Sequence, residues 1–201
     1  QKLSMAREIG DLSGESETLA NLGLAYYSLG EDIRAIDCYQ ECLKIAREIC
    51  DRKLEGTALG NLGLAYAAIG EYRKGIDFLN KDLAIAIEIS NRQREAVVLR
   101  YLGSILLKLE EYSESPEYLQ NVSQKYIHKS LKIFHEIGVP LEEAKTLKIL
   151  AIIYKRLNDA EIALECCIHA LDISTNLEMP LSKQLIKECE DLKYQLLNEA
   201  T

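Results

Sequence analysis

The feature that most constrains this chain is an internal repeat of forty residues. Residues 15–54 and 55–94 are identical at eighteen of forty aligned positions, and the longest shared stretch begins at Asn21 and Asn61. Weaker copies of that stretch occur at 99–104 and 147–154. Units that recur at a fixed period of this size usually form arrays in which each unit packs only on its neighbours. We therefore expect a stack of similar units.

The breaks between the units recur regularly. They come after Ile9, Ile49, Ile89, Ile137 and Leu177, a spacing of 40, 40, 48 and 40 residues. Asp11, Asp51 and Asn91 come after the first three breaks, and such side chains accept hydrogen bonds from the free N–H groups of a helix start. Pro140 and Pro180 come after the last two, where the missing N–H would have no helical partner in any case. The pattern predicts that a helix begins after every break.

Each unit carries two helical patterns. Apolar residues recur at helical spacing over 19–29 and again over 36–46, and Gly30 marks the turn between the two helices. One slot on the first helix holds a small residue in all four units, namely Gly23, Gly63, Gly103 and Ala151. A larger side chain there would push two closely packed helices apart. The predicted fold class is all-α, built from antiparallel helix hairpins.

These residues resemble the tetratricopeptide repeat (TPR) family. Its first-helix pattern of Leu, a small residue and Tyr maps onto Leu22, Gly23 and Tyr26, and its second-helix pattern maps onto Ala35 and Tyr39. The period is longer than the usual ~34 residues and is similar to that of kinesin light chain, of spindle-orientation G-protein modulators and of bacterial signalling arrays. The resemblance implies a right-handed α-solenoid that binds proteins or peptides.

The expected organisation is a single array over residues 1–201. Its repeats are 11–50, 51–90, 91–138 and 139–178, with the tail of a preceding repeat at 1–10 and a C-terminal capping helix at 179–201. The third repeat holds eight extra residues near 113–125, which we interpret as about two added turns on its second helix. A surface bulge without function and a ledge for a partner are the alternatives. Because the chain opens inside a unit, we expect it to be part of a larger protein.

Composition and motifs argue against several classes of function. The net charge of −8 disfavours nucleic acid as a partner, and no apolar run approaches the ~20 residues of a membrane span. His128, His135 and His169 show no metal-ligand spacing, and no phosphate-binding motif is present. The cysteines are Cys38, Cys42, Cys50, Cys166, Cys167 and Cys189, which we interpret as core residues of a cytoplasmic protein. We expect no enzyme activity, no cofactor and no metal.

In the TPR family the first helix of each pair lines a concave peptide-binding face, and the resemblance carries that role onto this chain. The corresponding positions are Asn21, Leu24, Tyr27, Asn61, Leu64, Arg100, Tyr101, Ser104, Lys108, Lys145, Lys148, Ile152, Lys155 and Arg156. Asn21 and Asn61 take the slot in which the family often holds a peptide backbone, since an amide offers both a donor and an acceptor. A cross-helix hydrogen bond is the alternative. Tyr101 and Ile149 replace the asparagine in the last two repeats, so a continuous ladder of amides is not expected.

The predicted groove is basic in its C-terminal half although the chain is acidic. Its cations are Arg100, Lys108, Lys145, Lys148, Lys155 and Arg156. Like charges along one surface predict an acidic segment in the partner, and side chains that simply point into solvent are the alternative. The function that we expect is a protein- or peptide-binding scaffold module of a signalling or regulatory protein. A self-associating array and a regulatory segment attached to an ATPase or protease domain are the other hypotheses, and the oligomeric state is open.

Overall fold

The computed structural model describes residues 2–110, 116–177 and 180–199. Over these residues ten α-helices follow one another without a strand, so the predicted all-α class is confirmed. The helices are α1 (Lys2–Ile9), α2 (Leu12–Ser28), α3 (Asp32–Glu48), α4 (Arg52–Ala68), α5 (Tyr72–Glu88), α6 (Arg92–Glu110), α7 (Pro116–Ile137), α8 (Pro140–Arg156), α9 (Ala160–Asn176) and α10 (Pro180–Glu199). None of these helices is both long and apolar enough to cross a membrane.

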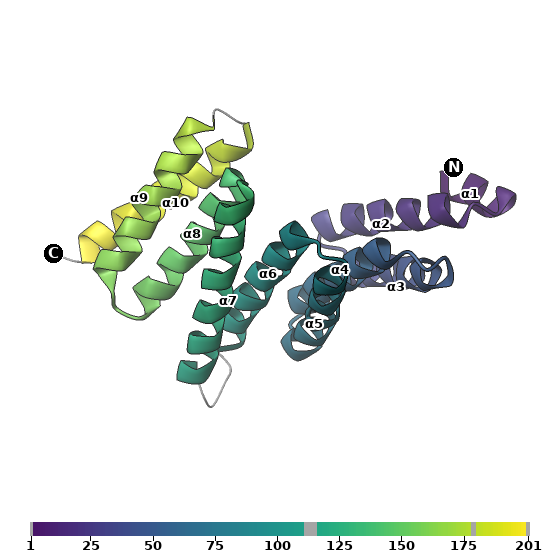
Figure 1. Cartoon of the computed structure of the whole chain (residues 1–201), viewed down its shortest axis with the longest axis horizontal. Helices are drawn as coiled ribbons and strands as arrows, with labels where there is room; N and C mark the ends of the chain where they lie inside the picture. The colour runs from purple at the N-terminus through teal and green to yellow at the C-terminus, as the bar shows by residue number, and fades with distance from the viewer. Residues whose placement is uncertain (1, 111–115, 178–179, 200–201) are drawn as a thin grey trace. The chain divides into compact units, whose positions relative to one another are not determined.

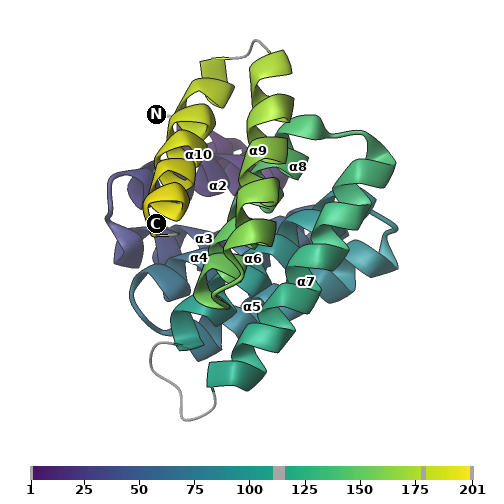
Figure 2. The same cartoon turned by 90° about the vertical axis from the view of Figure 1, so that its left-hand side faces the viewer.

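The chain forms two compact units, residues 1–105 and 106–201, and the boundary falls within α6. In unit one, α2 packs on α3, α3 on α4 and α4 on α5 (Figure 1). In unit two, α7 packs on α8, α8 on α9 and α9 on α10 (Figure 2). Within each unit, consecutive helices therefore stack in sequence, as in an α-solenoid. The repeat boundaries given above stay a prediction.

The predicted helix starts are present. Asp11 and Asp51 each accept a hydrogen bond from the backbone N–H three residues on, at 2.9 Å, and Asn91 accepts one at 3.0 Å. Pro140 is the first residue of α8. Asp159 makes a further cap of the same kind at the start of α9, at 3.2 Å. A capping side chain thus marks the starts of α2, α4, α6 and α9.

The small residues of the first helices lie where two helices meet. A Cβ atom on Gly23 would lie 2.5 Å from Cε1 of Tyr39, and one on Gly63 would lie 2.9 Å from the backbone oxygen of Gly75. Ala151 is fully buried in unit two. These distances are shorter than van der Waals contact, so a side chain at either glycine would force the hairpin open. The close approach predicted from the sequence is confirmed.

The extra residues of the third repeat lengthen its second helix in part. α7 begins at Pro116 and has 22 residues where α3, α5 and α9 have 17. The difference of five residues is about one and a half turns of helix instead of the expected two. Positions 113–115 of the expected insertion lie outside the described residues.

The last helix has one buried apolar side, and its outer side mixes polar residues with the exposed Tyr194 and Leu197. Leu185, Cys189 and Leu196 are buried against the rest of unit two, whereas Lys187 and Glu190 are exposed. Apolar residues at i, i+4 and i+11 place one stripe along a helix that packs on α9. A capping helix needs a polar outer side, which α10 has only in part, and its role as a cap stays a prediction.

Candidate functional site

In unit one, the predicted groove residues of α2 and α4 are accessible to a partner. Asn21 and Leu24 are exposed, Leu24 at 54%, and Tyr27, Asn61 and Leu64 are half-buried. α2 also contacts α4 directly, although α3 lies between them in sequence. We call the accessible side chains of these neighbouring first helices the first-helix face.

The amides of Asn21 and Asn61 are available on this face. Within the part of the chain that the structure describes, neither side chain makes a hydrogen bond to another residue. The cross-helix hydrogen bond that was the alternative explanation is therefore not observed. An amide with an open donor and an open acceptor can pair with the N–H and C=O of an extended peptide.

Tyrosines of α2 and α6 lie near each other in unit one. Burial raises the pKa of the Tyr27 phenol, and Asp32 and Tyr101 raise it further. Such coupling requires Tyr101 of α6 to lie near Tyr27 of α2. The guanidinium carbon of Arg100 lies 5.4 Å from the centroid of the Tyr101 ring, within reach of a cation–π contact. The hydroxyl of Ser104 donates a hydrogen bond to the backbone carbonyl of Arg100, on the same helix, at 2.9 Å.

A partly buried ion pair lies between α4, α5 and α6. Arg94 donates through Nε to Oδ1 of Asp82 at 3.1 Å and through Nη2 to Oδ2 at 2.5 Å. Nη2 also reaches the backbone oxygen of Gly56 at 3.3 Å. Asp82 is fully buried, and burial raises the pKa of its carboxyl even though Arg94 acts in the opposite direction. The lack of a side chain at Gly60 provides the space that Arg94 occupies, because a Cβ atom there would lie 2.1 Å from Nη2 of Arg94.

A cavity of about 110 Å³ adjoins this pair. Its lining includes Lys53 and Thr57 of α4, Ile85 of α5, and Asn91 and Arg94. Sequence reasoning missed both the ion pair and the cavity. The available signal was the glycine at position 60, where the first repeat has alanine, together with a charged residue in each neighbouring helix.

In unit two, the predicted cations of α8 are largely engaged within the unit. Lys145 donates to Glu142 on its own helix at 2.6 Å. Lys148 pairs with Glu188 of α10, and this pairing lowers the pKa of the Glu188 carboxyl. An acidic ligand would have to compete with these carboxylates for the two lysines.

The two remaining cations of α8 also have partners. Lys155 donates to Oε1 of Gln195 on α10 at 3.2 Å, and Arg156 donates to the backbone oxygen of Leu107 at 3.1 Å. Lys108, on the last turn of α6, is exposed. The sequence placed these side chains on the correct helices, but it gave no sign that α10 would supply partners for two of them.

A shallow cavity of about 260 Å³ opens between α8 and α10. It is lined by Lys148, Ile152, Glu188, Asp191, Leu192 and Gln195. Ile152 and Leu192 form its apolar part, and two carboxylates and one ammonium group surround them. The predicted groove residues Lys148 and Ile152 therefore do line a depression, and much of its wall comes from the helix expected to be a cap.

Four of the six cysteines are buried in the core, as expected. Cys42, Cys166, Cys167 and Cys189 are buried and free. Burial raises the pKa of Cys167 to about 12 and that of Cys189 to about 11, so both thiols stay protonated at neutral pH. Among the described residues, no group of three or more His, Cys, Asp or Glu side chains is placed to hold a metal ion.

The core interpretation is wrong for Cys50 and holds only in part for Cys38. Cys50 is exposed because it follows the end of α3 in the turn to α4, where its φ is 56°. Cys38 is half-buried on α3. A residue in such a turn lies beyond the apolar face of the helix, so helical spacing does not determine its burial.

The fold and its exposed first helices define an α-helical repeat protein. Residues 16–48 match the family model for the tetratricopeptide repeat, so the hairpin of α2 and α3 is a repeat of that family. The chain is similar to the crystal structure of BtubC (BKLC) from P. vanneervenii, with a TM-score of 0.75, 17% identity, and coverage of 98% of this chain and 86% of that one. It is also similar to the crystal structure of a Podosopora anserina putative kinesin light chain with nearly identical TPR-like repeats, at a TM-score of 0.64, 12% identity and coverage of 90% and 93%.

These similarities define the fold. At identities this low they show that the chain has the architecture of TPR-like repeat proteins. No curated protein matches the chain. Repeats of this kind typically act as non-catalytic scaffolds for protein–protein interaction.

Proposed function

We propose that this chain is a protein- or peptide-binding scaffold that holds its partner along the first-helix face. The observation that carries the proposal is the pair of equivalent asparagines, Asn21 and Asn61, whose amides make no hydrogen bond to the described residues of unit one. Leu24 and Leu64 lie three residues further along the same helices and are accessible. Amides that hold a backbone and leucines that contact side chains together suit an extended polypeptide.

The charge of the partner is a further part of the proposal. Lys145 and Lys148 are paired with Glu142 and Glu188, and an acidic segment would bind by exchanging those carboxylates for its own. Such an exchange gains little net free energy, because one ion pair replaces another. We propose that acidic residues of the partner act mainly on the rate and orientation of binding.

The charge proposal is tested by reversing Lys148 and Arg156 to glutamate. We expect the double variant to bind an acidic peptide more slowly while its helicity by circular dichroism stays the same. Association rates measured at about 20 mM and 300 mM salt give the control, since an electrostatic effect is screened at the higher value. Unchanged rates in both buffers would rule out a role for these two cations.

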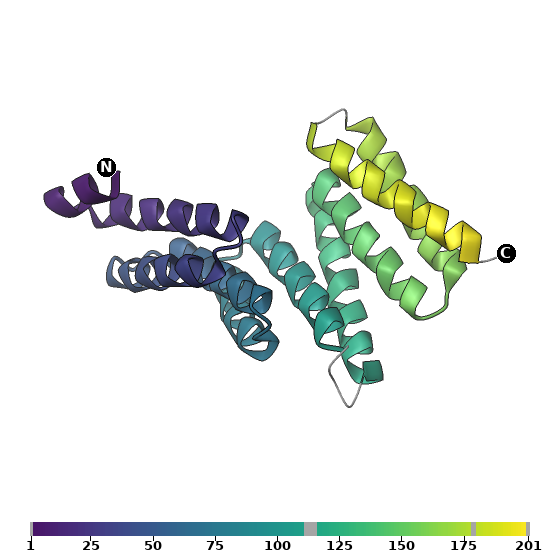
Figure 3. The ribbon, with the colours of Figure 1, turned by 180° about the vertical axis from the view of Figure 1, so that it is seen from behind.

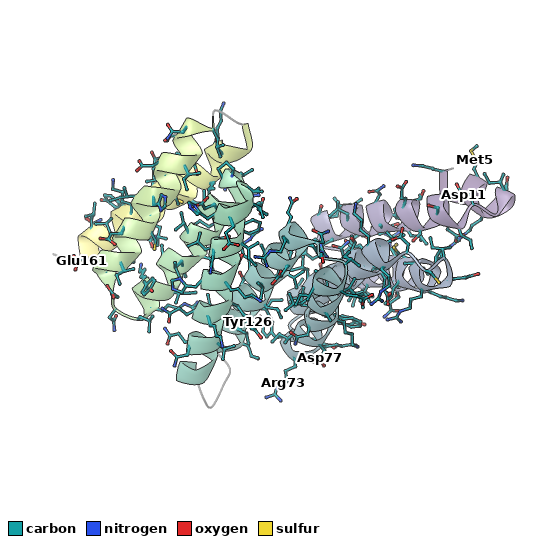
Figure 4. All side chains as sticks on the ribbon, viewed as in Figure 1. Met5, Asp11, Arg73, Asp77, Tyr126 and Glu161 are labelled. Carbon is teal, nitrogen blue, oxygen red and sulfur yellow. The ribbon has the colours of Figure 1, made fainter. Side chains whose placement is uncertain are left out.

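The main test uses a peptide library to find a ligand and then calorimetry on variants of the full chain. We expect Asn21→Ala and Asn61→Ala together to weaken binding of a selected peptide at least tenfold, because each removes a bidentate contact to the backbone. The matched control is Asp37→Ala with Asp77→Ala, which changes equivalent exposed residues on the second helices; Asp77 is labelled in Figure 4. If the control weakens binding as much as the asparagine variant, the first-helix face is not the site.

The setting of this scaffold is also proposed. Four buried protonated cysteines support a reducing compartment, and we propose the cytoplasm. A scaffold of this kind fits a non-catalytic segment of a larger signalling or regulatory protein. Tracking a tagged full-length protein in cells by microscopy tests the location.

A further inference from the structure

The cavity beside Asp82 and Arg94 lies wholly within unit one. Arg94 of α6 contacts both Asp82 of α5 and the backbone oxygen of Gly56 on α4, so the start of α6 lies against the pair formed by α4 and α5 (Figure 3). The volume of about 110 Å³ is more than one water molecule requires. The other polar residues that line the cavity are Lys53, Thr57 and Asn91. The cavity can therefore hold a small polar group.

The lining of the cavity has one more positive charge than negative charges. Asp82 is fully buried, and both of its carboxylate oxygens accept hydrogen bonds from Arg94, which balances its charge. Lys53 is exposed, and its ammonium group has no ion-pair partner within the described part of the chain. The remaining charge is complementary to one singly charged anion.

Asn91 adds hydrogen-bond donors to this charge. Its Oδ1 atom caps α6 by accepting from the backbone N–H of Arg94 at 3.0 Å. Among the residues that the structure describes, its Nδ2 group has no partner. Asp11 and Asp51 make the same cap with a carboxylate, which has no N–H to donate. Of these three caps, the one that lines the cavity is thus the one that brings N–H donors with it.

The equivalent place in the preceding repeat carries the opposite charge. Forty residues earlier in the chain stand Ser13, Glu17, Asp51 and Leu54, in place of Lys53, Thr57, Asn91 and Arg94. Two of these four residues are acidic, and neither cation has a basic counterpart. Ser16 stands in place of Gly56, and its hydroxyl donates to the backbone oxygen of Cys42 at 3.3 Å. The positive charge of the cavity is therefore specific to this part of the array and is not required by the repeat itself.

We propose that the cavity binds one carboxylate group, supplied by the polypeptide that occupies the first-helix face. Lys53 provides the opposite charge, and Nδ2 of Asn91 donates a hydrogen bond. A carboxylate carries the single charge that the cavity lacks, whereas a phosphate group carries about 1.5 to 2 negative charges at neutral pH. Thr57 lies about one helical turn from Asn61 on α4, so a residue of a chain held at Asn61 can reach the cavity. The source of the carboxylate rests on the function proposed above, but the affinity of the cavity for a carboxylate does not.

The first test uses sodium acetate as the probe and the amide chemical shifts of the full chain as the readout. We expect acetate, exchanged for chloride at constant ionic strength, to shift the amides of residues 53–57 and 91–94 along saturable curves. Asn91→Asp should weaken acetate binding about tenfold, because the variant loses a hydrogen bond to a charged group but keeps the cap that Asp51 makes elsewhere. Asp51→Asn is the matched control at that other cap and should leave acetate binding unchanged.

A second pair of variants tests the charge of the cavity. Lys53→Gln should weaken acetate binding by a similar factor, whereas Lys44→Gln, which removes an exposed lysine of α3, should not. The absence of a saturable shift with acetate would overturn the proposal, and so would an unchanged acetate affinity in the Asn91→Asp protein. Tighter binding of inorganic phosphate than of acetate would overturn the assignment to a carboxylate.

The source of the carboxylate is tested with a peptide selected on the full chain. One altered peptide carries glutamine in place of its acidic residues, and another has an amidated C-terminus. We expect Asn91→Asp to weaken binding of the parent peptide and to have no effect on one of the altered peptides, which identifies the carboxylate as a side chain or as the C-terminus. If Asn91→Asp affects all three peptides equally, the partner does not place a carboxylate in the cavity and the proposal is wrong.

The two proposals fail separately in these experiments. Saturable acetate binding, together with peptides that do not depend on Asn21 and Asn61, would contradict the proposed function and retain the carboxylate site. Peptides that depend on both asparagines, in a chain that binds no acetate, would retain the proposed function and remove the carboxylate site.

Discussion

Nδ1 of His135 lies 3.0 Å from Oε1 of Glu143, and this contact joins the end of α7 to the first turn of α8. Arg47 and Glu55 make the same link between α3 and α4. The position eight residues before the acidic residue thus holds a cation-forming side chain at both junctions. Arginine carries its charge at all working pH values, whereas an imidazole is charged only when protonated.

His135→Arg should stabilise unit two at pH 8 by about 0.5 kcal/mol or less, because the exposed guanidinium gains only a screened ion pair with Glu143. The urea midpoint measures the change. His169→Arg is the matched control, since His169 is an exposed histidine on α9. A midpoint shift of the same size in the control would mean that the added charge, and not the pair, is responsible.

Protonation of Glu55 should make the chain less stable in acid. Burial alone would raise the pKa of its carboxyl, but hydrogen bonds from Arg47 and Arg52 outweigh burial and hold the pKa below its usual value. A carboxyl with a lowered folded-state pKa stabilises the fold above its unfolded pKa, and this contribution is lost as the pH falls through the folded value. We expect Glu55→Gln to lower stability at pH 7 by about 1 kcal/mol and to reduce the loss between neutral and acidic pH. Urea titrations at several pH values check this, and parallel curves for both proteins would contradict it.

Asp82 should change the stability of the fold with pH in the opposite direction to Glu55. Burial raises the pKa of its carboxyl despite Arg94, so its contribution to stability is present at low pH and is lost as the pH rises through the folded-state value. Asp82→Asn removes the titrating group and should flatten that decline. The unfolding midpoint of the variant, compared with the parent at pH 4 and pH 7, gives the measurement. A steeper decline in the variant would show that the ionised pair with Arg94 stabilises more than burial costs.

Gly60→Ala should destabilise unit one by about 1–3 kcal/mol, as is typical for overpacking. The added methyl group would stand 2.3 Å from Oδ2 of Asp82 and 2.1 Å from Nη2 of Arg94. In an Arg94→Ala background the same substitution should lower the free energy of unfolding by less, because the guanidinium is absent. Thermal unfolding of the four proteins of this cycle gives the coupling, and additive effects would show that the alanine is accommodated without touching the ion pair.

Lys148→Glu should loosen α10. The substitution removes the ion pair with Glu188 and places two carboxylates together, so we expect faster amide exchange along α10 and a loss of about 0.5–1 kcal/mol. Adding Glu188→Lys restores opposite charges in reversed order and should recover most of the loss. If the double variant exchanges as fast as the single one, the contact between α8 and α10 does not depend on this pair.

Periodicity and local chemistry were enough to predict the helix starts and the close helix contacts. Asp11 and Asp51 cap helices and Gly23 allows a close approach, because a capping oxygen acts three residues away and a small residue at a fixed helical position repeats its role in every unit. The pairing of Lys148 with Glu188 could not be predicted in this way. It depends on the rotation and offset of α10 against α8, which residue spacing within one helix does not determine.

The glycines at 63 and 75 have a consequence for exchanging parts between repeats. In the α4–α5 hairpin, backbone faces backbone at this point, whereas the α2–α3 hairpin places the ring of Tyr39 against Gly23. A chimaera that moved α3 into the place of α5 would bring Ala35 and Tyr39 to a seam that is closed around Gly75 and Leu79. A shared period therefore does not make the hairpins modular, and each first helix has to be transplanted together with its own second helix.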